Sequence, residues 1–220
     1  MYRVTLLETK VEVIVEPQLA KVRKPAPKWE AMAWWDGKFQ RIKLDQFLGK
    51  YVVLFFWPLD FTFVCPTEIA AFSDAAEEFE KLNVQVIGCS VDSQFTHREY
   101  TLKPRSEGGL GPMKVPMVAD SLQAIARSYG CLIEDTADDD CGVAMRATYI
   151  IDDKGILRQC SVSDLPVGRN VEEVLRLVKA FKYTDEHGEV CPSGWTPGKA
   201  TMTPDVASKK LADFWANEHG

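Results

Sequence analysis

The sequence predicts an α/β protein with a central mixed β-sheet flanked by helices, followed by an extended C-terminal arm. Between residues 51 and 183, apolar runs rich in β-forming residues alternate with segments whose apolar residues recur every three or four positions. After Tyr183 this alternation ends, and prolines and glycines become frequent. The change predicts a folded domain followed by an arm.

The first part of the domain reads as strand, helix and strand. Residues 51–57 (YVVLFFW) are an apolar run that predicts a strand covered on both faces, and residues 84–90 (VQVIGCS) predict a second one. Between them lies a stripe with helical spacing, which predicts a helix packed on the sheet. The stripe consists of Ile69, Phe72, Ala76, Phe79 and Leu82.

The second part reads as a short helix, a β-hairpin and a long helix. Ser121 is expected to cap the short helix, which ends at Gly130. Residues 147–162 predict a hairpin around the turn signal DDKG. Asn170 is expected to cap the long helix. The apolar side of that helix carries Val171, Val174, Leu175, Val178 and Phe181.

An N-terminal extension precedes this domain. Residues 24–27 (KPAP) contain two prolines, which resist helix and central strand alike. They predict a boundary between an extension, residues 1–26, and the domain, residues 27–183. Within the extension, residues 4–16 alternate between β-branched and polar residues and predict an added strand or hairpin.

The arm, residues 184–220, is expected to close with a short helix over residues 205–216. It carries more large apolar residues than so short a segment buries by itself. These residues are Val190, Trp195, Phe214 and Trp215. We therefore expect the arm to pack on something else, such as a second subunit.

Composition excludes several classes of protein. Hydrophobic residues make up 46% and charged residues 26%, as in a folded chain rather than a disordered one. The net charge of −6 argues against nucleic-acid binding, because no excess of cations is available to meet phosphates. No apolar run approaches the ~20 residues that span a bilayer, so no membrane association is expected.

The N-terminal residues and the cysteines indicate a compartment. Residues 1–24 lack the continuous apolar core of a secretion signal, and Glu8, Glu12 and Glu16 disfavour a mitochondrial presequence. We therefore expect a cytoplasmic protein. In that reducing compartment, six cysteines in 220 residues are more often buried filler, metal ligands or catalysts than halves of permanent disulfides.

Four of the cysteines suggest no catalytic role. No pair is spaced as C-x-x-C, and the three histidines lie far apart, so we expect no thioredoxin-type dithiol and no metal site. Cys89 and Cys160 lie in predicted strands and are expected to be small buried apolar residues. Cys131 and Cys141 bracket an acidic segment, which would dampen thiol reactivity; a local disulfide between them is an alternative.

Cys65 has a different setting. It stands between the loop at residues 58–64 and a predicted helix, directly before Pro66. Either Thr62 caps the helix and Cys65 lies in its first turn, or Cys65 is the cap and Pro66 takes the first helical position. Both alternatives place the sulfur at the positive end of the helix dipole, which stabilises the reactive thiolate.

Cys191 lies in the arm, in a stretch rich in proline and glycine. A thiol in such a segment can move to react with the sulfur of another cysteine. The alternative is an incidental surface cysteine. The residues alone leave both interpretations open.

Two segments resemble the signature motifs of the typical 2-Cys peroxiredoxins. They are residues 61–68 (FTFVCPTE), preceded by Pro58, and residues 187–195 (HGEVCPSGW). The resemblance covers about residues 27–204. Further matching stretches are SVDS at 90–93, GGLG at 108–111, DLPVGR at 164–169 and WTPG at 195–198.

The resemblance implies a thioredoxin-like fold and a role for each matching residue. Cys65 is expected to be the peroxidatic cysteine and Cys191 the resolving cysteine, joined across subunits in a redox-active disulfide. Pro58 is expected to shield the site, and Thr62 to hydrogen-bond the thiolate and the incoming peroxide oxygen. No metal, haem or flavin is implied.

Three charged residues complete the implied site. Arg146 matches the family's active-site arginine, whose charge would stabilise both the thiolate and the departing oxygen of the peroxide. Glu68 and Arg169 match the ion-pair network that orients this arginine.

The resemblance also implies substrates and partners. The expected activity is that of a thiol peroxidase that reduces hydrogen peroxide and organic hydroperoxides and is recycled by thioredoxin or a thioredoxin-like protein. The expected assembly is an antiparallel homodimer, which further associates as a pentamer of dimers. A chaperone-like holdase activity of the higher oligomer is a secondary expectation.

The sequence departs from the family pattern in two places besides the extension. Residues 134–143 (EDTADDDCGV) are lengthened and acidic just before Arg146. Near the C-terminus the family's Tyr-Phe pair is absent, and Phe214-Trp215 lies a few positions later.

Overall fold

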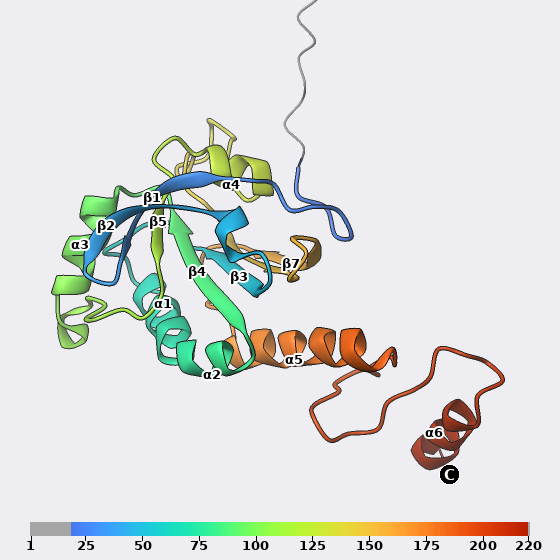
Figure 1. Cartoon of the computed structure of the whole chain (residues 1–220). Coiled ribbons are helices and arrows are strands. Elements are labelled where there is room, and N and C mark those ends of the chain that lie inside the picture. Colours follow the sequence, from blue (N-terminus) through green and yellow to red (C-terminus); the bar gives the residue numbers. More distant parts are fainter. Residues whose placement is uncertain (1–18, 220) are drawn as a thin grey trace, which may run out of the picture.

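Seven strands form one mixed sheet in the order β2-β1-β5-β4-β3-β6-β7 (Figure 1). The computed structural model describes residues 19–219. The three central strands β5, β4 and β3 run parallel, and the pairs toward either edge are antiparallel. The strands are β1 Glu30–Trp35, β2 Lys38–Lys43, β3 Tyr51–Phe56, β4 Val84–Ser90, β5 Met117–Ala119, β6 Arg146–Ile151 and β7 Leu157–Ser163.

Helices cover both faces of the sheet. One face is packed by α1, α2, α3 and α5, and the other by α4 and the short 3₁₀ helix η1. The sixth helix, α6, stands apart from the sheet at the end of the arm (Figure 1). The helices are η1 Leu44–Phe47, α1 Cys65–Asp74, α2 Ala76–Lys81, α3 Gln94–Leu102, η2 Arg105–Glu107, α4 Ala124–Tyr129, α5 Val171–His187 and α6 Lys209–His219.

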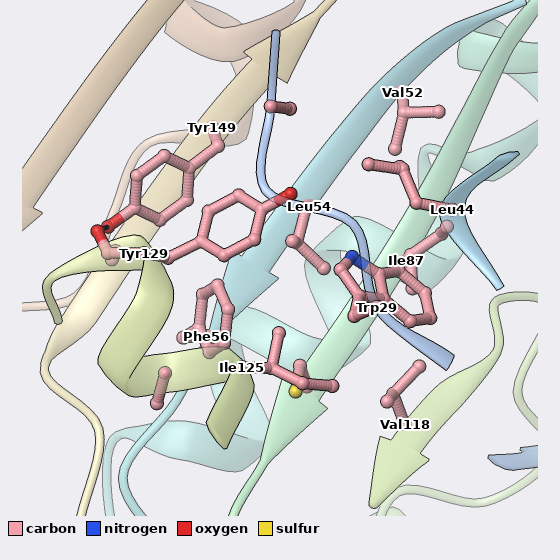
Figure 2. Close-up of a cluster of buried hydrophobic side chains, with 14 of the residues drawn as sticks. Trp29, Leu44, Val52, Leu54, Phe56, Ile87, Val118, Ile125, Tyr129 and Tyr149 are labelled. Carbon is pink, nitrogen blue, oxygen red and sulfur yellow. Dashed lines mark hydrogen bonds between the residues drawn. The ribbon is translucent and has the colours of Figure 1, made fainter. Parts of the chain in front are cut away.

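Strand β3 separates the two apolar cores. Every residue of the strand is buried, as its continuous apolar run predicts. Val52, Leu54 and Phe56 point into the core shared with α4, where Figure 2 shows them beside Trp29 and Tyr129. The alternate residues of the strand enter the opposite core with α1 and α5. The α1 core also contains Cys65, so the sheet supports the candidate site directly.

The predicted elements of the domain are present, with two differences. The expected helix over 69–82 is divided into α1 and α2 at Ala75. Ser121 does not cap α4: the helix begins later, and the buried carboxylate of Asp120 accepts from the backbone amides of Ile125 and Ala126 at 3.0 and 2.7 Å. Asp120 takes the role expected of Ser121, because each of its two carboxylate oxygens accepts from one of these amides.

Several elements have no counterpart in the sequence prediction. These are the β1–β2 hairpin, β5 and α3. Helix α5 continues through His187, so the extended chain begins at Gly188 rather than at residue 184. The strand or hairpin predicted for residues 4–16 lies outside the described residues. Among the described helices, none is long and apolar enough to cross a bilayer.

Candidate active site

Cys65 is the first residue of α1 and lies just beyond the end of β3. Val64 occupies the cap position, so neither capping alternative from the sequence is correct, although Cys65 does lie in the first turn with Pro66 behind it. The side chain is 1% exposed. The thiol therefore lies at the positive end of the α1 dipole, shielded from bulk water, where the partial charge of the helix acts strongly.

Arg146 contacts the Cys65 sulfur. Its Nη1 lies 3.4 Å from Cys65 Sγ and donates to Glu68 Oε2 at 2.6 Å, while Nε donates to the carbonyl of Leu165 at 2.5 Å. Arg146 opens β6, which pairs with β3, and this strand pairing brings together two residues that are 81 positions apart. Burial opposes the charged guanidinium, but the adjacent Cys65 and Glu68 raise the pKa of Arg146.

Glu68 joins two arginines beneath the sulfur. Its carboxylate accepts from Arg169 Nε at 2.7 Å as well as from Arg146, and both ion pairs are almost completely buried. Burial alone would raise the pKa of Glu68, but the hydrogen bonds and charges of Arg169, with the charge of Arg146, lower it. Arg169 also donates to the Ala147 carbonyl at 2.6 Å. Glu68 is thus an anion that holds Arg146 in one position.

Pro58 and Thr62 lie in the loop between β3 and α1. Pro58 is buried and Thr62 is half-buried. The Thr62 hydroxyl donates to the Leu59 carbonyl at 3.0 Å. Among the described residues this hydroxyl makes no hydrogen bond to Cys65, and the Cys65 sulfur is instead contacted by Arg146.

A buried polar group that sequence reasoning missed anchors this loop. Asp60 Oδ1 accepts from Trp57 Nε1 at 2.9 Å, and Oδ2 lies 2.7 Å from Nδ1 of His97 in α3. The other ring nitrogen of His97 lies 3.1 Å from the Val118 carbonyl. The sequence shows Asp60 beside the motif, but nothing in it connects this residue to His97.

Cys191 follows α5 in the arm and packs against the second half of that helix. Its half-buried thiol is 3.9 Å from the carbonyl of Ala180. Burial raises the pKa of Cys191, with Glu189 adding to the shift and Arg176 opposing it. Cys65 and Cys191 are both free thiols here. The first part of the arm returns along α5, where Arg176 Nη1 donates to the Trp195 carbonyl at 3.0 Å, and no disulfide joins the two sulfurs within this chain.

The other four cysteines are also free. Cys89 is buried as expected, whereas Cys160 is exposed, because β7 is an edge strand and its second half lies uncovered. Cys131 and Cys141 form no disulfide: Cys131 is buried and Cys141 is exposed. Burial raises the pKa of Cys131 to about 12. Within residues 19–219, no three His, Cys, Asp or Glu side chains gather as metal ligands.

Comparison with known proteins places this geometry in a family. The AhpC/TSA family matches residues 22–160, and the C-terminal domain of 1-Cys peroxiredoxin matches residues 180–217. Bovine peroxiredoxin-2 is 59% identical over 87% of this chain and 94% of its own length. Human peroxiredoxin-4 is 56% identical over 86% of this chain and 68% of its own length.

Solved structures agree with the fold. The reduced 2-Cys peroxiredoxin of Plasmodium vivax superposes with a TM-score of 0.81 at 40% identity, covering 89% of this chain and 98% of that one. Thioredoxin peroxidase I of Plasmodium yoelii gives a TM-score of 0.70 at 41% identity, covering 81% and 100%. The thioredoxin-like fold predicted from the motifs is therefore confirmed. The chain belongs to the AhpC/TSA family, among its 2-Cys peroxiredoxins.

Proposed function

We propose that Cys65 is the peroxidatic cysteine of this thiol peroxidase, and that it reduces hydrogen peroxide and organic hydroperoxides. The observation that carries the proposal is the position of Arg146 Nη1, 3.4 Å from a buried sulfur at a helix N-terminus. The thiolate attacks one peroxide oxygen, the S–O bond forms and the O–O bond breaks. Sulfur is oxidised to a sulfenic acid, and the departing oxygen takes a proton to become water or an alcohol.

The neighbouring residues have complementary roles in this proposal. The Arg146 cation favours the thiolate and stabilises the negative charge that grows on the departing oxygen. Glu68 and Arg169 hold that guanidinium in place, so little reorganisation is needed in the transition state. Pro58 shields the sulfur from water. The Thr62 hydroxyl exchanges its bond to Leu59 for one to the bound peroxide.

Cys191 is the resolving cysteine in this proposal. Its thiol condenses with the Cys65 sulfenic acid of the partner subunit, releases water and forms an interchain disulfide. The outer part of the arm, beyond Trp195, extends away from the domain (Figure 1), which supports a contact with a partner subunit. Thioredoxin or a thioredoxin-like dithiol protein would then reduce the disulfide, as the name of the P. yoelii relative suggests.

The two edges of the sheet support a homodimer through β7. The outer edge of β2 carries Lys38, Arg41 and Lys43, and charges of this kind prevent strand pairing. Residues 160–163 of β7 (CSVS) are exposed and uncharged, so this edge is free to pair with a second copy.

An exposed aromatic group supports association of dimers into a decamer. Phe63 is 94% exposed at the active-site loop, and Phe95 is 60% exposed on α3. Phe39 packs edge-on against Phe95 at 5.0 Å. Large exposed apolar groups of this kind mark interaction surfaces. Sizing of the reduced and oxidised protein would test the assembly, and its sensitivity to Phe95→Glu would test the surface.

The cytoplasm is the proposed location. All six cysteines are free in this structure, and a reducing cytoplasm would keep those outside the catalytic cycle reduced. A relative from Plasmodium falciparum is mitochondrial, so fractionation of the native source is the appropriate test.

Peroxide consumption coupled to thioredoxin tests the function. Wild type is expected to turn over, whereas Cys65→Ser is expected to be inactive and Cys89→Ser, a change at a buried cysteine in β4, is expected to retain activity. Turnover by Cys65→Ser would contradict the assignment of the peroxidatic cysteine.

A further inference from the structure

Tyr100 has a buried hydroxyl for whose proton the described residues supply no hydrogen-bond acceptor. The residue belongs to α3 and is 0% exposed. Buried polar groups in native proteins are almost always paired, so an unpaired one calls for an explanation. The peroxidase chemistry described above gives this hydroxyl no role.

The tyrosine lies between three parts of the active-site region. Its ring packs on Phe61 of the active-site loop, with centroids 4.5 Å apart, and its carbonyl accepts from the Leu110 amide at 3.0 Å. Tyr100, Leu110 and Cys65 are members of one buried core cluster. Phe61 has a φ of 57°, in the left-handed region, so packing on Tyr100 holds a backbone conformation that is costly for this residue.

The hydroxyl keeps its proton. Burial holds the pKa of Tyr100 well above its usual value, with nearby Asp60 and Cys65 adding to the shift and the backbone amide of Phe61 opposing it. An amide can donate to the hydroxyl oxygen but cannot accept its proton. Tyr100 is therefore a hydrogen-bond donor without an acceptor, in the same core cluster as the reactive sulfur.

We propose that the Tyr100 hydroxyl is a further catalytic donor, which hydrogen-bonds to the oxygen that Cys65 receives from peroxide. The inference rests on the proposed role of Cys65. During the transfer the S–O bond forms and the O–O bond breaks, and Tyr100 donates a hydrogen bond without losing its proton. The bond is absent in the reduced enzyme and present once oxygen reaches sulfur.

This timing is what gives the hydroxyl a kinetic effect. An interaction that exists in the transition state but not in the ground state raises the rate, whereas one present in both does not. A donor held in position by the ring packing also needs no reorganisation when the oxygen arrives. In the reduced chain the Tyr100 hydroxyl then lacks an acceptor, and it gains one when the Cys65 sulfur receives the peroxide oxygen.

Tyr100→Phe tests the proposal because it keeps the ring and its packing on Phe61 and removes only the hydroxyl. Tyr149→Phe is the matched control: Tyr149 is also buried, but its hydroxyl donates to the Tyr129 carbonyl at 2.6 Å, on the other face of the sheet. Both changes are made in the full-length Cys191→Ser protein, so that the Cys65 sulfenic acid is not consumed by disulfide formation. Stopped-flow oxidation by hydrogen peroxide and the thermal midpoint are measured for each.

We expect Tyr100→Phe to lower the second-order rate of Cys65 oxidation at least tenfold, the effect of about one hydrogen bond to a charged group, with its midpoint unchanged or raised. Tyr149→Phe is expected to lower the midpoint and keep the rate within twofold of the parent. A rate within twofold in Tyr100→Phe would overturn the proposal. So would a rate loss that accompanies a drop in midpoint as large as that of the control, since the role would then be structural.

A different result identifies a failure of the underlying function. If the Cys191→Ser parent forms no sulfenic acid at Cys65, the assignment of the peroxidatic cysteine is wrong, and the role of Tyr100 is wrong with it. Mass measurement of the Cys65 peptide after peroxide treatment distinguishes this case from a failure of the Tyr100 proposal alone.

Discussion

At the scale of single residues, Glu68 organises the site. Removing a carboxylate from water is costly, and one arginine often fails to compensate for it. Glu68 has two, Arg169 and Arg146, and it also accepts from the backbone amide of Arg169 at 2.7 Å. The result is a fixed Arg146 whose Nη1 is shared between Glu68 and the Cys65 sulfur.

Arg146→Ala is expected to slow the reaction of Cys65 with peroxide by ~10²–10³-fold, because one stabilising contact to the developing oxyanion is lost. The measurement is stopped-flow oxidation under pseudo-first-order conditions. Arg158→Ala is the control, since it removes an arginine paired with Asp185 at 2.8 Å rather than with the site. A rate for Arg146→Ala within a few-fold of wild type would remove this residue from the mechanism.

Glu68 also predicts a pH dependence of stability. Its pKa in the folded protein lies below the ordinary value of 4.5, so the carboxylate stabilises the fold fully above pH 4.5. That contribution is lost as the pH falls through the lower folded pKa. We therefore expect the difference in unfolding free energy between wild type and Glu68→Gln to shrink as the pH falls below 4.5. Urea titrations at several pH values measure it, and a difference that grows in acid would contradict the assigned charge state.

At the scale of elements, the reactive sulfur depends on a strand, a loop and a helix start. Strand β3 ends at Phe56, and its two buried faces fix the point from which the loop departs. Asp60 and His97 hold the loop, and α1 then begins at Cys65 itself. A thiol in the first position of the helix lies at the positive end of the helix dipole.

The cap of α5 is the clearest prediction at this scale. The Asn170 side chain accepts from the amides of Glu172 at 2.9 Å and Glu173 at 3.4 Å. Asn170→Ala is expected to lower the unfolding free energy by about 1 kcal/mol, whereas Asn170→Ser should retain most of it. Urea unfolding of both variants tests this, and an Asn170→Ala variant as stable as wild type would show that the cap contributes nothing.

At the scale of the whole molecule, the chain is asymmetric. The β2 edge is protected by basic residues, the β7 edge is open, and the arm leaves the domain (Figure 1). Trp195 and Phe214 are nearly buried within the chain, but Trp215 stays 51% exposed and Val206 97%. The arm therefore keeps apolar surface exposed, as the proposed contact with a second copy requires.

The interchain disulfide is tested by mixing two inactive variants. Mild peroxide is expected to produce a covalent dimer in wild type and none in Cys65→Ser or Cys191→Ser alone. After the two variants exchange subunits, one Cys65 meets one Cys191 across the interface, so a covalent dimer should reappear on non-reducing gels. Its failure to reappear, together with an intramolecular bond in wild type, would show that the arm folds back on its own chain.

The open β7 edge is tested by adding a charge to it. Val162 is 43% exposed on this strand, and Val162→Lys is expected to weaken the reduced dimer, as edge lysines do. Leu122→Lys, at a position 86% exposed away from the strand, is the control. Analytical ultracentrifugation measures both, and equal dissociation constants would exclude this edge as the interface.

Local features of the fold could be predicted from the sequence because they depend on neighbouring residues. The apolar run of β3, the Asn170 cap and the position of Cys65 in the first turn of a helix each reflect local patterning. The β1–β2 hairpin also had a local signal that was missed: Asp36-Gly37, both with positive φ, is the two-residue turn of such hairpins. Exposure of Cys160 was not predicted, because strand patterning does not reveal which strand lies at an edge.

By itself, the sequence determined the fold class, the family and the candidate residues. Helix and strand periodicity and the two cysteine motifs depend only on residues that are close together in the chain. Only the tertiary structure decided which of those residues meet. The pairing of β6 with β3 brings Arg146 to Cys65. The packing of α3 brings His97 within hydrogen-bond distance of Asp60. The unpaired hydroxyl of Tyr100 is visible only there as well. Such contacts join residues distant in the chain, and long-range packing rather than local pattern sets their geometry.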